Sequence, residues 1–324
     1  MMHSRSANIT LASSNPEKFT LVAADDNEAA IVDRQIAYAN SAQIDYIAFL
    51  DMRTNWYAHT PRVFDLYRQS SNKGNLKYSV IMGSPASDGE TWADRSARLL
   101  AYFADSFYVR VHDDRPLLYL YNLSDWSKTQ VDQLRSDSIS AGLGDPYVVG
   151  MTDSSSYSSF LDGASEYASV EAGVVRNFGG TLNSIPLVSL GVNDEPRQDN
   201  PPPWGAWGPD EPPVTPSLLS DDLTEALDWT VSNPSQNPAN TVLIYAWNEH
   251  AEAASNVEPT RNGDGTINTT ILDTIGEVLD HYDAGRVTPA GNLLTNGGFE
   301  SGTSGWGAQA SSSSSESGIV HSSR

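Results

Sequence analysis

Two glutamates, Glu249 and Glu252, are the residues in this sequence best placed to do chemistry. They follow directly after an apolar run, residues 241–247 (TVLIYAW), in the segment NEHAE. If that run is a buried strand and the chain then turns, both carboxylates can face one pocket. One can stay ionised beside a donor such as Asn248, while burial and its neighbour's charge raise the pKa of the other. Glycoside hydrolysis asks for that division of roles, although a solvated loop is the alternative interpretation.

Aromatic and charged residues near the ends of other predicted strands could bind a sugar. Trp247 offers a flat face for stacking, with core packing as the alternative, and His250 could donate to a hydroxyl or be structural. Residues 192–213 form a long stretch rich in proline, which we interpret as a pocket wall or sugar platform rather than a structural flap. The candidate substrate-binding residues are Trp247, Asn248, His250, Asp51, Tyr121, Asp194, Arg197, Trp204 and Trp207. A local ion pair is the alternative for Asp194 with Arg197, and for Asp51 with Arg53.

Several other chemistries lack the residues that they need. The chain has no cysteine, which removes disulfides, thiolate zinc sites and cysteine nucleophiles. Its 6 histidines show no HxxxH or HxH spacing, so we expect no metal site and no cofactor. The segment NGDGT at 262–266 lacks the spaced carboxylates of a calcium loop and predicts a turn, with Thr266 or Asn268 capping a helix over 271–279. No nucleophile-elbow, dinucleotide-binding or phosphate-loop motif is present.

The charge balance narrows the class of partner. Lysine and arginine total 19 against 41 aspartate and glutamate, a net charge of −22. Such a field repels phosphate backbones and anionic membranes, so we expect neither as a partner. No apolar run is long enough to span a bilayer. Hydrophobic residues make up 39% of the chain, enough to build a core. A neutral carbohydrate remains compatible with this surface, and the oligomeric state stays open.

The elements that must position the glutamates are short buried strands alternating with helices. Most of the predicted strands are apolar on both faces, as in a parallel sheet covered by helices. They span residues 44–50, 76–82, 116–122, 146–151, 164–170, 185–191 and 241–247. Helical patterns cover 28–41, 91–104 and 218–231, the last capped by Asp221 or Asp222. The fold class is therefore α/β, most simply a (β/α)8 TIM-type barrel.

The first of the eight barrel strands is the weak point of this prediction. It would have to come from residues 8–24, where only 9–12 and 19–23 are apolar, so it is incomplete or atypical. We expect the barrel to occupy residues 1–288. After Pro289 the composition turns to serine and glycine, and residues 289–324 are too few for an independent core. They predict a linker and a disordered or loosely attached tail.

The segment YAWNEHAEAASNVEPT, residues 245–260, resembles the signature of glycoside hydrolase family 99-like proteins, including WbsX-like relatives. The turn GDGT at 263–266 and the segments 33–50, 115–121 and 191–197 extend the resemblance over roughly residues 20–285. The family's second tryptophan in the motif is His250 here, and its glycine after the second glutamate is Ala253. Residues 292–306 (NLLTNGGFESGTSGW) are similar to the start of a carbohydrate-binding module that is cut short.

The resemblance implies a retaining glycosidase without a metal. Glu249 would be the general base that deprotonates the sugar's own 2-hydroxyl, and Glu252 the general acid/base. An axial 2-hydroxyl suits this chemistry, so the first expected substrate is an α-mannoside in a polysaccharide or glycan. Because a module-like segment follows the barrel, we expect a secreted or extracellular protein. No leader is recognisable at the start of the sequence, so a cytoplasmic protein is the alternative. The rival functions are a non-catalytic carbohydrate-binding protein on a degenerate barrel and a polysaccharide-assembly glycosyltransferase.

Overall fold

The computed structural model describes residues 28–51, 60–83, 90–151, 155–169, 171–175, 182–193, 211–249, 254–262, 264–285, 308–310 and 317–319. The chain divides into two compact units, Met1–Val278 and Leu279–Arg324. The first unit contains the central sheet and all the candidate site residues. In the second unit, β13 (Ala308–Ala310) pairs antiparallel with β14 (Ser317–Ile319). The predicted boundary at residue 288 and the module-like segment at 292–306 lie outside the described residues.

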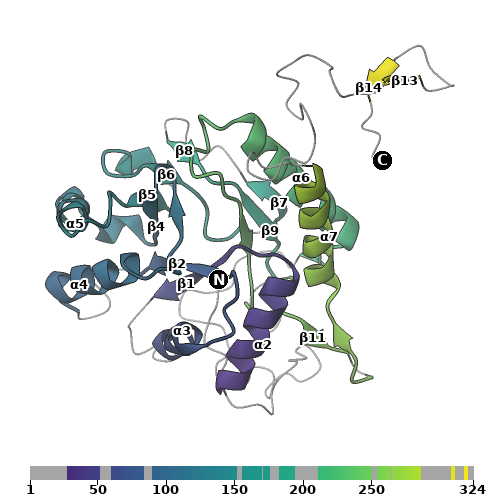
Figure 1. Ribbon diagram of the computed structural model, residues 1–324, viewed down its shortest axis with the longest axis horizontal. Helices are drawn as coiled ribbons and strands as arrows, with labels where there is room; N and C mark the ends of the chain where they lie inside the picture. Colours follow the sequence, from purple (N-terminus) through teal and green to yellow (C-terminus); the bar gives the residue numbers. More distant parts are fainter. Residues whose placement is uncertain are drawn as a thin grey trace. The chain divides into compact units, whose positions relative to one another are not determined.

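A parallel sheet forms the centre of the first unit, as the sequence predicts (Figure 1). Its strands pair in the order β1-β2-β4-β5-β6-β8, and each of these pairs is parallel. The strands are β1 (Tyr46–Asp51), β2 (Lys77–Met82), β4 (Arg115–Leu120), β5 (Tyr147–Gly150), β6 (Gly163–Ala164) and β8 (Asn183–Ser184). All their carboxyl ends therefore meet at one edge, where a barrel of this class carries its chemistry.

The sheet continues through a second group of strands. The chain runs from β8 into β9 (Leu187–Leu190), and the Ile185 N–H donates to the Ala164 carbonyl at 2.9 Å. On its other side, β9 pairs in parallel with β10 (Leu243–Tyr245). Residues 183–190 thus act as one barrel strand that joins β6 to β10. The described strands make a parallel run of seven, matching the seven that the sequence predicts.

One seam of this run stays open among the described residues, between β10 and β1. The strand expected there would come from residues 8–24, which lie outside the described part of the chain. The Tyr46 hydroxyl nevertheless bridges the seam, at 3.0 Å from the Thr241 hydroxyl and 2.8 Å from the Tyr119 hydroxyl. The two ends of the sheet therefore face each other, which agrees with a barrel-type arrangement.

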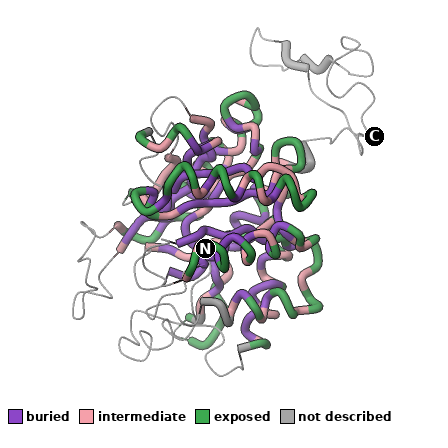
Figure 2. Tube along the Cα trace, turned by 90° about the vertical axis from the view of Figure 1, so that its left-hand side faces the viewer, coloured by how far each residue is buried: buried purple, intermediate pink, exposed green. Residues whose placement is uncertain are grey.

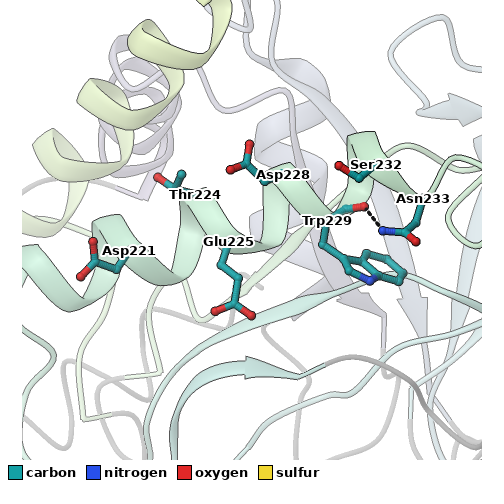
Figure 3. Close-up of a pocket in the computed structure, with 7 residues that line it drawn as sticks. All are labelled: Asp221, Thr224, Glu225, Asp228, Trp229, Ser232 and Asn233. Atoms are coloured by element: carbon teal, nitrogen blue, oxygen red, sulfur yellow. Dashed lines mark hydrogen bonds between the residues drawn. The ribbon is translucent and has the colours of Figure 1, made fainter. Parts of the chain in front are cut away.

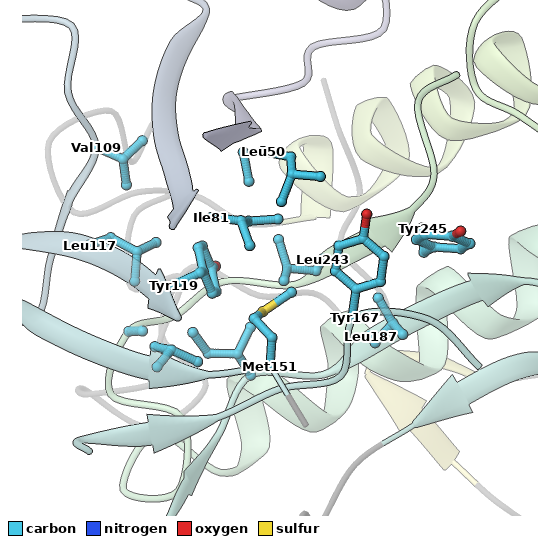
Figure 4. Close-up of a cluster of buried hydrophobic side chains, with 14 of the residues drawn as sticks. Leu50, Ile81, Val109, Leu117, Tyr119, Met151, Tyr167, Leu187, Leu243 and Tyr245 are labelled. Carbon is cyan, nitrogen blue, oxygen red and sulfur yellow. The ribbon is translucent and has the colours of Figure 1, made fainter. Parts of the chain in front are cut away.

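The interior of the sheet is filled by alternate residues of its strands. One buried cluster collects Leu50, Ile81, Leu117, Val149, Leu187 and Leu243 with the rings of Tyr119 and Tyr245 (Figure 4). Side chains from opposite strands meet in this cluster because every second residue of a strand points to the same face. The intervening residues point outward, and Phe49, Val80 and Leu118 are buried against the covering layer.

Helices cover the outer side of the sheet, with their exposed faces toward solvent (Figure 2). Two predicted helices are confirmed, α2 (Glu28–Ser41) and α4 (Trp92–Phe103), the latter capped by the Thr91 side chain. The predicted cap of α6 (Pro216–Ser232) is wrong, because Thr215 accepts from the Leu218 N–H and leaves Asp221 and Asp222 inside the helix. The helix predicted at 271–279 is the longer α7 (Thr270–Gly285).

Several elements of the structure have no clear pattern in the sequence. The predicted helices do not include α3 (Thr60–Gln69) or α5 (Lys128–Ser140), although Ser127 and Gln130 form a capping box at the start of α5. Also unpredicted are the strands β3 (Arg110–Val111) and β7 (Ala172–Val175), which are antiparallel to β4 and β9, and the hairpin of β11 (Thr260–Arg261) with β12 (Ile267–Asn268). The same holds for β13, β14 and the short 3-10 helices η1 (Leu123–Asp125) and η2 (Ser155–Tyr157). The strand predicted at 164–170 is wrong beyond Ala164, since β6 ends there. None of the described helices is both long and apolar enough to cross a bilayer.

A compact ionic network joins the amino-terminal ends of three strands. Asp162 accepts from Arg115 at 2.7 Å and from Arg135 at 2.6 Å, and both arginines also reach Asp145. Burial by itself lowers the pKa of Arg135, but its hydrogen bonds and charge contacts with Asp162 and Asp145 outweigh burial and raise it. The network lies opposite the carboxyl ends, so its role is stability.

Replacing Asp162 with Asn should lower the free energy of unfolding by about 2 kcal/mol, because two poorly solvated guanidinium groups lose their shared carboxylate. Denaturant unfolding at neutral pH measures this loss. Asp132→Asn is the control, since its pair with Lys128 is 50% and 54% exposed and should contribute no more than about 0.5 kcal/mol. Equal losses in the two variants would contradict the structural role of the network.

The Tyr46 hydroxyl gives a prediction at high pH. Burial raises its pKa from 10.0 to about 12. The folded state therefore holds this proton more tightly than the unfolded state, so the stabilisation is complete below pH 10 and is lost as pH rises toward 12. At pH 11 the free energy of unfolding should be about 1.4 kcal/mol lower on account of this group. Unfolding curves of the wild type and Tyr46→Phe measure it; an equally steep fall in both would contradict the assignment.

Candidate functional site

Glu249 lies just beyond the carboxyl end of the last described strand of the sheet. The ladder that places it runs from Leu243 opposite Leu187 to Tyr245 opposite Ser189. Trp247, Asn248 and Glu249 then follow with 4%, 0% and 3% of their surfaces exposed. Burying a carboxylate to this extent costs free energy unless hydrogen bonds or opposite charges replace its lost hydration. Glu249 is thus set into the protein at the edge where a barrel of this class carries its catalytic groups.

Several predicted site residues lie outside the described residues. These are Glu252, His250, Asp194, Arg197, Trp204 and Trp207, together with Arg53. In the sequence they belong to the segments that follow β1, β9 and β10. The shared cleft of Glu249 and Glu252 and the aromatic wall at 192–213 therefore stay predictions.

Asp51, at the end of β1, is 3% exposed and is held by two residues of α4. Arg98 forms an ion pair with its carboxylate, and the Tyr102 hydroxyl donates to the same oxygen at 3.2 Å. Arg98 also grips Glu90 through two hydrogen bonds, at 3.0 and 2.5 Å. Burial by itself lowers the pKa of Arg98, but the hydrogen bonds to Glu90 and the charge of Asp51 outweigh burial and raise it. The sequence predicted Asp51 with Arg53 as its alternative partner; the partner found here is Arg98.

A second arginine of α4 ties the neighbouring strand ends together. Arg95 is completely buried, donates to the Gly83 carbonyl at 2.9 Å and lies 3.5 Å from the Glu90 carboxylate. Its guanidinium also stacks over Trp126, whose indole N–H donates to the Tyr121 carbonyl at 3.0 Å. These contacts therefore hold Gly83 and Tyr121, the residues that follow β2 and β4. No sequence signal pointed to Arg95 or Arg98, because arginines on a helix usually face solvent.

A row of three tyrosines crosses the same edge of the sheet. The ring of Tyr121, which follows β4, lies 4.7 Å from that of Tyr167, and Tyr167 lies 5.7 Å from Tyr245 at the end of β10. Tyr121 was predicted as a sugar contact and is half-buried, so part of its surface is open. Tyr167 and its half-buried neighbour Glu166 were not singled out by the sequence, since the run at 164–170 was interpreted as a strand. Their position in the sequence just after β6 could have indicated that they lie at the carboxyl edge of the sheet.

The sequence suggests that Trp247 offers an open face for stacking, but in the structure the residue is buried. Its surface is 4% exposed, so the ring is packed in the protein. Its indole N–H is buried without a hydrogen-bond partner, as is the side-chain oxygen of Asn256 on the returning chain. The stacking role of Trp247 stays a prediction.

The turn at NGDGT is confirmed. Asp264 accepts from the Thr266 N–H at 2.9 Å and from its hydroxyl at 2.6 Å, between strands β11 and β12. The hydrogen bonds from Thr266 lower the pKa of Asp264. Asn268 accepts from the Thr270 N–H at 3.0 Å. The Thr269 carbonyl accepts the first helical bond, from the Asp273 N–H at 2.8 Å, so the cap of α7 is Thr269 and the cap predicted at Thr266 or Asn268 is wrong. Within the described residues no group of three or more histidines, aspartates or glutamates is arranged to hold a metal ion.

An open groove of ≈ 560 Å³ runs along the outer face of α6 (Figure 3). It is lined by one stripe of that helix: Asp221, Thr224, Glu225, Asp228, Trp229, Ser232 and Asn233. Burial, together with the charges of Glu225 and Asp221, raises the pKa of the adjacent Asp222. This groove shares no residue with the edge that carries Glu249. It is a feature of the outer helix layer.

The arrangement of the parallel sheet and its covering helices is similar to that of several solved structures. No family model and no curated protein matches the sequence. Among solved structures, the fold is similar to the GH99 endo-alpha-mannosidase from Bacteroides thetaiotaomicron in complex with BIS-TRIS-propane, with a TM-score of 0.55 and 13% identity over 82% of this chain and 88% of that one. A second structure of the enzyme gives 0.54 at 14% identity, over 82% of this chain and 84% of that one. A glycoside hydrolase-like protein gives 0.57 at 13% identity, over 82% and 89%. The likeness establishes the fold.

The raised pKa of Asp222 predicts how the stability of the protein depends on pH. Because its pKa is raised, the folded state favours the neutral acid, and this contribution is present at low pH and lost as pH rises through the folded pKa. Asp222→Asn should therefore stabilise the protein at pH 7 by a few tenths of a kcal/mol, a gain limited by solvent screening, and by less below about pH 4. Thermal unfolding measures it.

The control is Asp65→Asn on the exposed face of α3, which should leave the melting temperature unchanged. A gain for Asp222→Asn that persists unchanged in acid would contradict the electrostatic cause.

Proposed function

We propose that this protein is a retaining glycoside hydrolase that acts on α-mannose-containing polysaccharides or glycans. The observation that carries the proposal is Glu249, a carboxylate buried to 3% exposure at the carboxyl end of the last strand. The fold around it is similar to that of GH99 endo-alpha-mannosidases.

In the proposed reaction, Glu249 removes the proton from the sugar's 2-hydroxyl while Glu252 protonates the leaving oxygen. The 2-oxygen attacks the anomeric carbon and the glycosidic bond breaks, which gives an epoxide-like intermediate. Water then opens the intermediate at the anomeric carbon; Glu252 accepts the water's proton and Glu249 returns its proton to the 2-oxygen. Two inversions at one carbon amount to retention. The cycle consumes one water and leaves both carboxyl groups as they began.

The surroundings of Glu249 suit a neutral sugar that becomes cationic in the transition state. Four carboxylates of the described part, Asp51, Glu90, Glu249 and Glu258, are mostly or fully buried. The guanidinium groups of Arg95 and Arg98 neutralise Asp51 and Glu90. The excess negative charge at this edge favours positive charge that develops at the anomeric carbon. The half-buried Tyr121 can contact the apolar face of a sugar ring.

Replacing Glu249 by Gln, and separately Glu252 by Gln, should each lower kcat on a soluble α-mannan by about 10²–10⁴, the contribution expected of a general acid or base. Release of reducing ends measures the rate, and nuclear magnetic resonance of the first product gives its anomeric configuration, which should match that of the substrate.

Glu277→Gln is the control, because Glu277 lies on the exposed face of α7. Hydrolysis that persists within about tenfold in both active-site variants would overturn the proposal. Mannan binding by the wild type without any hydrolysis would favour the non-catalytic carbohydrate-binding function instead.

A further inference from the structure

The chain that leaves β10 returns to the same place a few residues later. The Val257 N–H donates to the Ala246 carbonyl at 3.1 Å, and the Glu258 N–H donates to the Trp247 carbonyl at 2.8 Å. The Ala254 N–H donates to the Gly191 carbonyl, just beyond β9, at 3.0 Å. These bonds close the chain between Trp247 and Glu258 into a loop. Glu249 is the second residue of that loop.

The returning end of the loop is anchored by a buried side-chain pair. The Glu258 carboxylate is 4% exposed and accepts from the Gln35 side-chain amide at 2.9 Å. Gln35 is 3% exposed and belongs to α2, whose neighbouring residues Ile36 and Ile31 are buried in the core. The pair joins positions 223 residues apart in the sequence. A firmly packed helix thus reaches across to the loop that carries Glu249.

We propose that Gln35 and Glu258 are positioning residues for Glu249, a role that rests on the proposed function and deepens it. The amide of Gln35 fixes the Glu258 side chain, and the Glu258 backbone fixes the carbonyl of Trp247, two residues before Glu249. Through these two bonds α2 sets the direction in which the Glu249 carboxylate points. Neither residue touches the substrate in this scheme.

The energetic cost of the pair supports a role beyond packing. A buried carboxylate loses its hydration, and the hydrogen bonds that it accepts must return that free energy. An apolar residue at position 258 would be less costly if the site needed only filling. What the carboxylate adds is a directed acceptor for Gln35. Misplacing a reacting group by about 1 Å can slow a reaction about 100-fold, which is the scale at which such a device matters.

The test uses Gln35→Ala, Glu258→Ala, the double variant and Glu258→Gln, with a soluble α-mannan as the probe. Each alanine variant should lower kcat by about 10- to 100-fold with KM changed by less than about threefold, because orientation and not binding is lost. The double variant should be no slower than the slower single variant, since both break one link. Glu258→Gln keeps an acceptor oxygen and should recover kcat to within about threefold of the wild type.

Asn237→Ala is the matched control. Asn237 is 1% exposed and donates to the Thr241 carbonyl at 2.8 Å, so it fixes the opposite end of β10. Its loss should lower the melting temperature about as much as Gln35→Ala does and leave kcat unchanged. An equal fall of kcat in Asn237→Ala and Gln35→Ala would make the pair merely structural and overturn the proposal.

Amide hydrogen exchange separates this proposal from the proposed function. In Gln35→Ala the Val257 and Glu258 N–H groups should exchange at least about tenfold faster than in the wild type, while the amides of β1 and β2 keep their rates. If the wild type hydrolyses no mannan, the enzymatic function fails, and this measurement still decides whether Gln35 holds the loop. Unchanged exchange at both amides would overturn the positioning role, whatever the activity.

Discussion

The parallel pairing of strands is the constraint on which the rest of this structure depends. Because β1, β2, β4, β5, β6, β8, β9 and β10 run in the same direction, their carboxyl ends share one edge. Asp51, Tyr121 and Glu249, which are far apart in the sequence, therefore come to the same side. The pairing of β9 with β10 is the decisive step for the site, since it carries the chain directly into Trp247, Asn248 and Glu249. A slip of one residue in that ladder would turn each of these side chains to the opposite face.

The two ends of the sheet use buried charge differently. At the amino-terminal end, Arg115 and Arg135 meet Asp145 and Asp162, so charges balance and the network stabilises the fold. At the carboxyl end, Arg98 and Arg95 neutralise Asp51 and Glu90, and the side chains of Glu249 and Glu258 are also buried. The chain as a whole carries a net charge of −22 and so produces a negative field. That field suits a neutral sugar and disfavours a phosphate-bearing one.

Local patterns were sufficient to predict much of the fold. The apolar spacing of residues 28–41 and 91–104 predicts helices that the structure confirms within a residue. The seven apolar runs correspond to the seven parallel barrel strands, although β6 is far shorter than its run. The helix α5 was missed because only Val131 and Leu134 mark its buried side strongly, and its polar residues obscure the period. Glu249 was selected from its position after a strand, and Tyr121 and Asp51 from the same rule.

The sequence by itself determined the parallel strands of the central sheet, most of the helices and the carboxylate at position 249, because these depend on residues close together along the chain. Only the tertiary structure decided that Asp51 pairs with Arg98, that three tyrosines form a row, and that Gln35 meets Glu258 across 223 residues. Contacts of this kind have no local periodicity. They exist because the parallel sheet and its covering helices bring distant segments together. No pattern within a window of the sequence encodes which partner a buried side chain will meet.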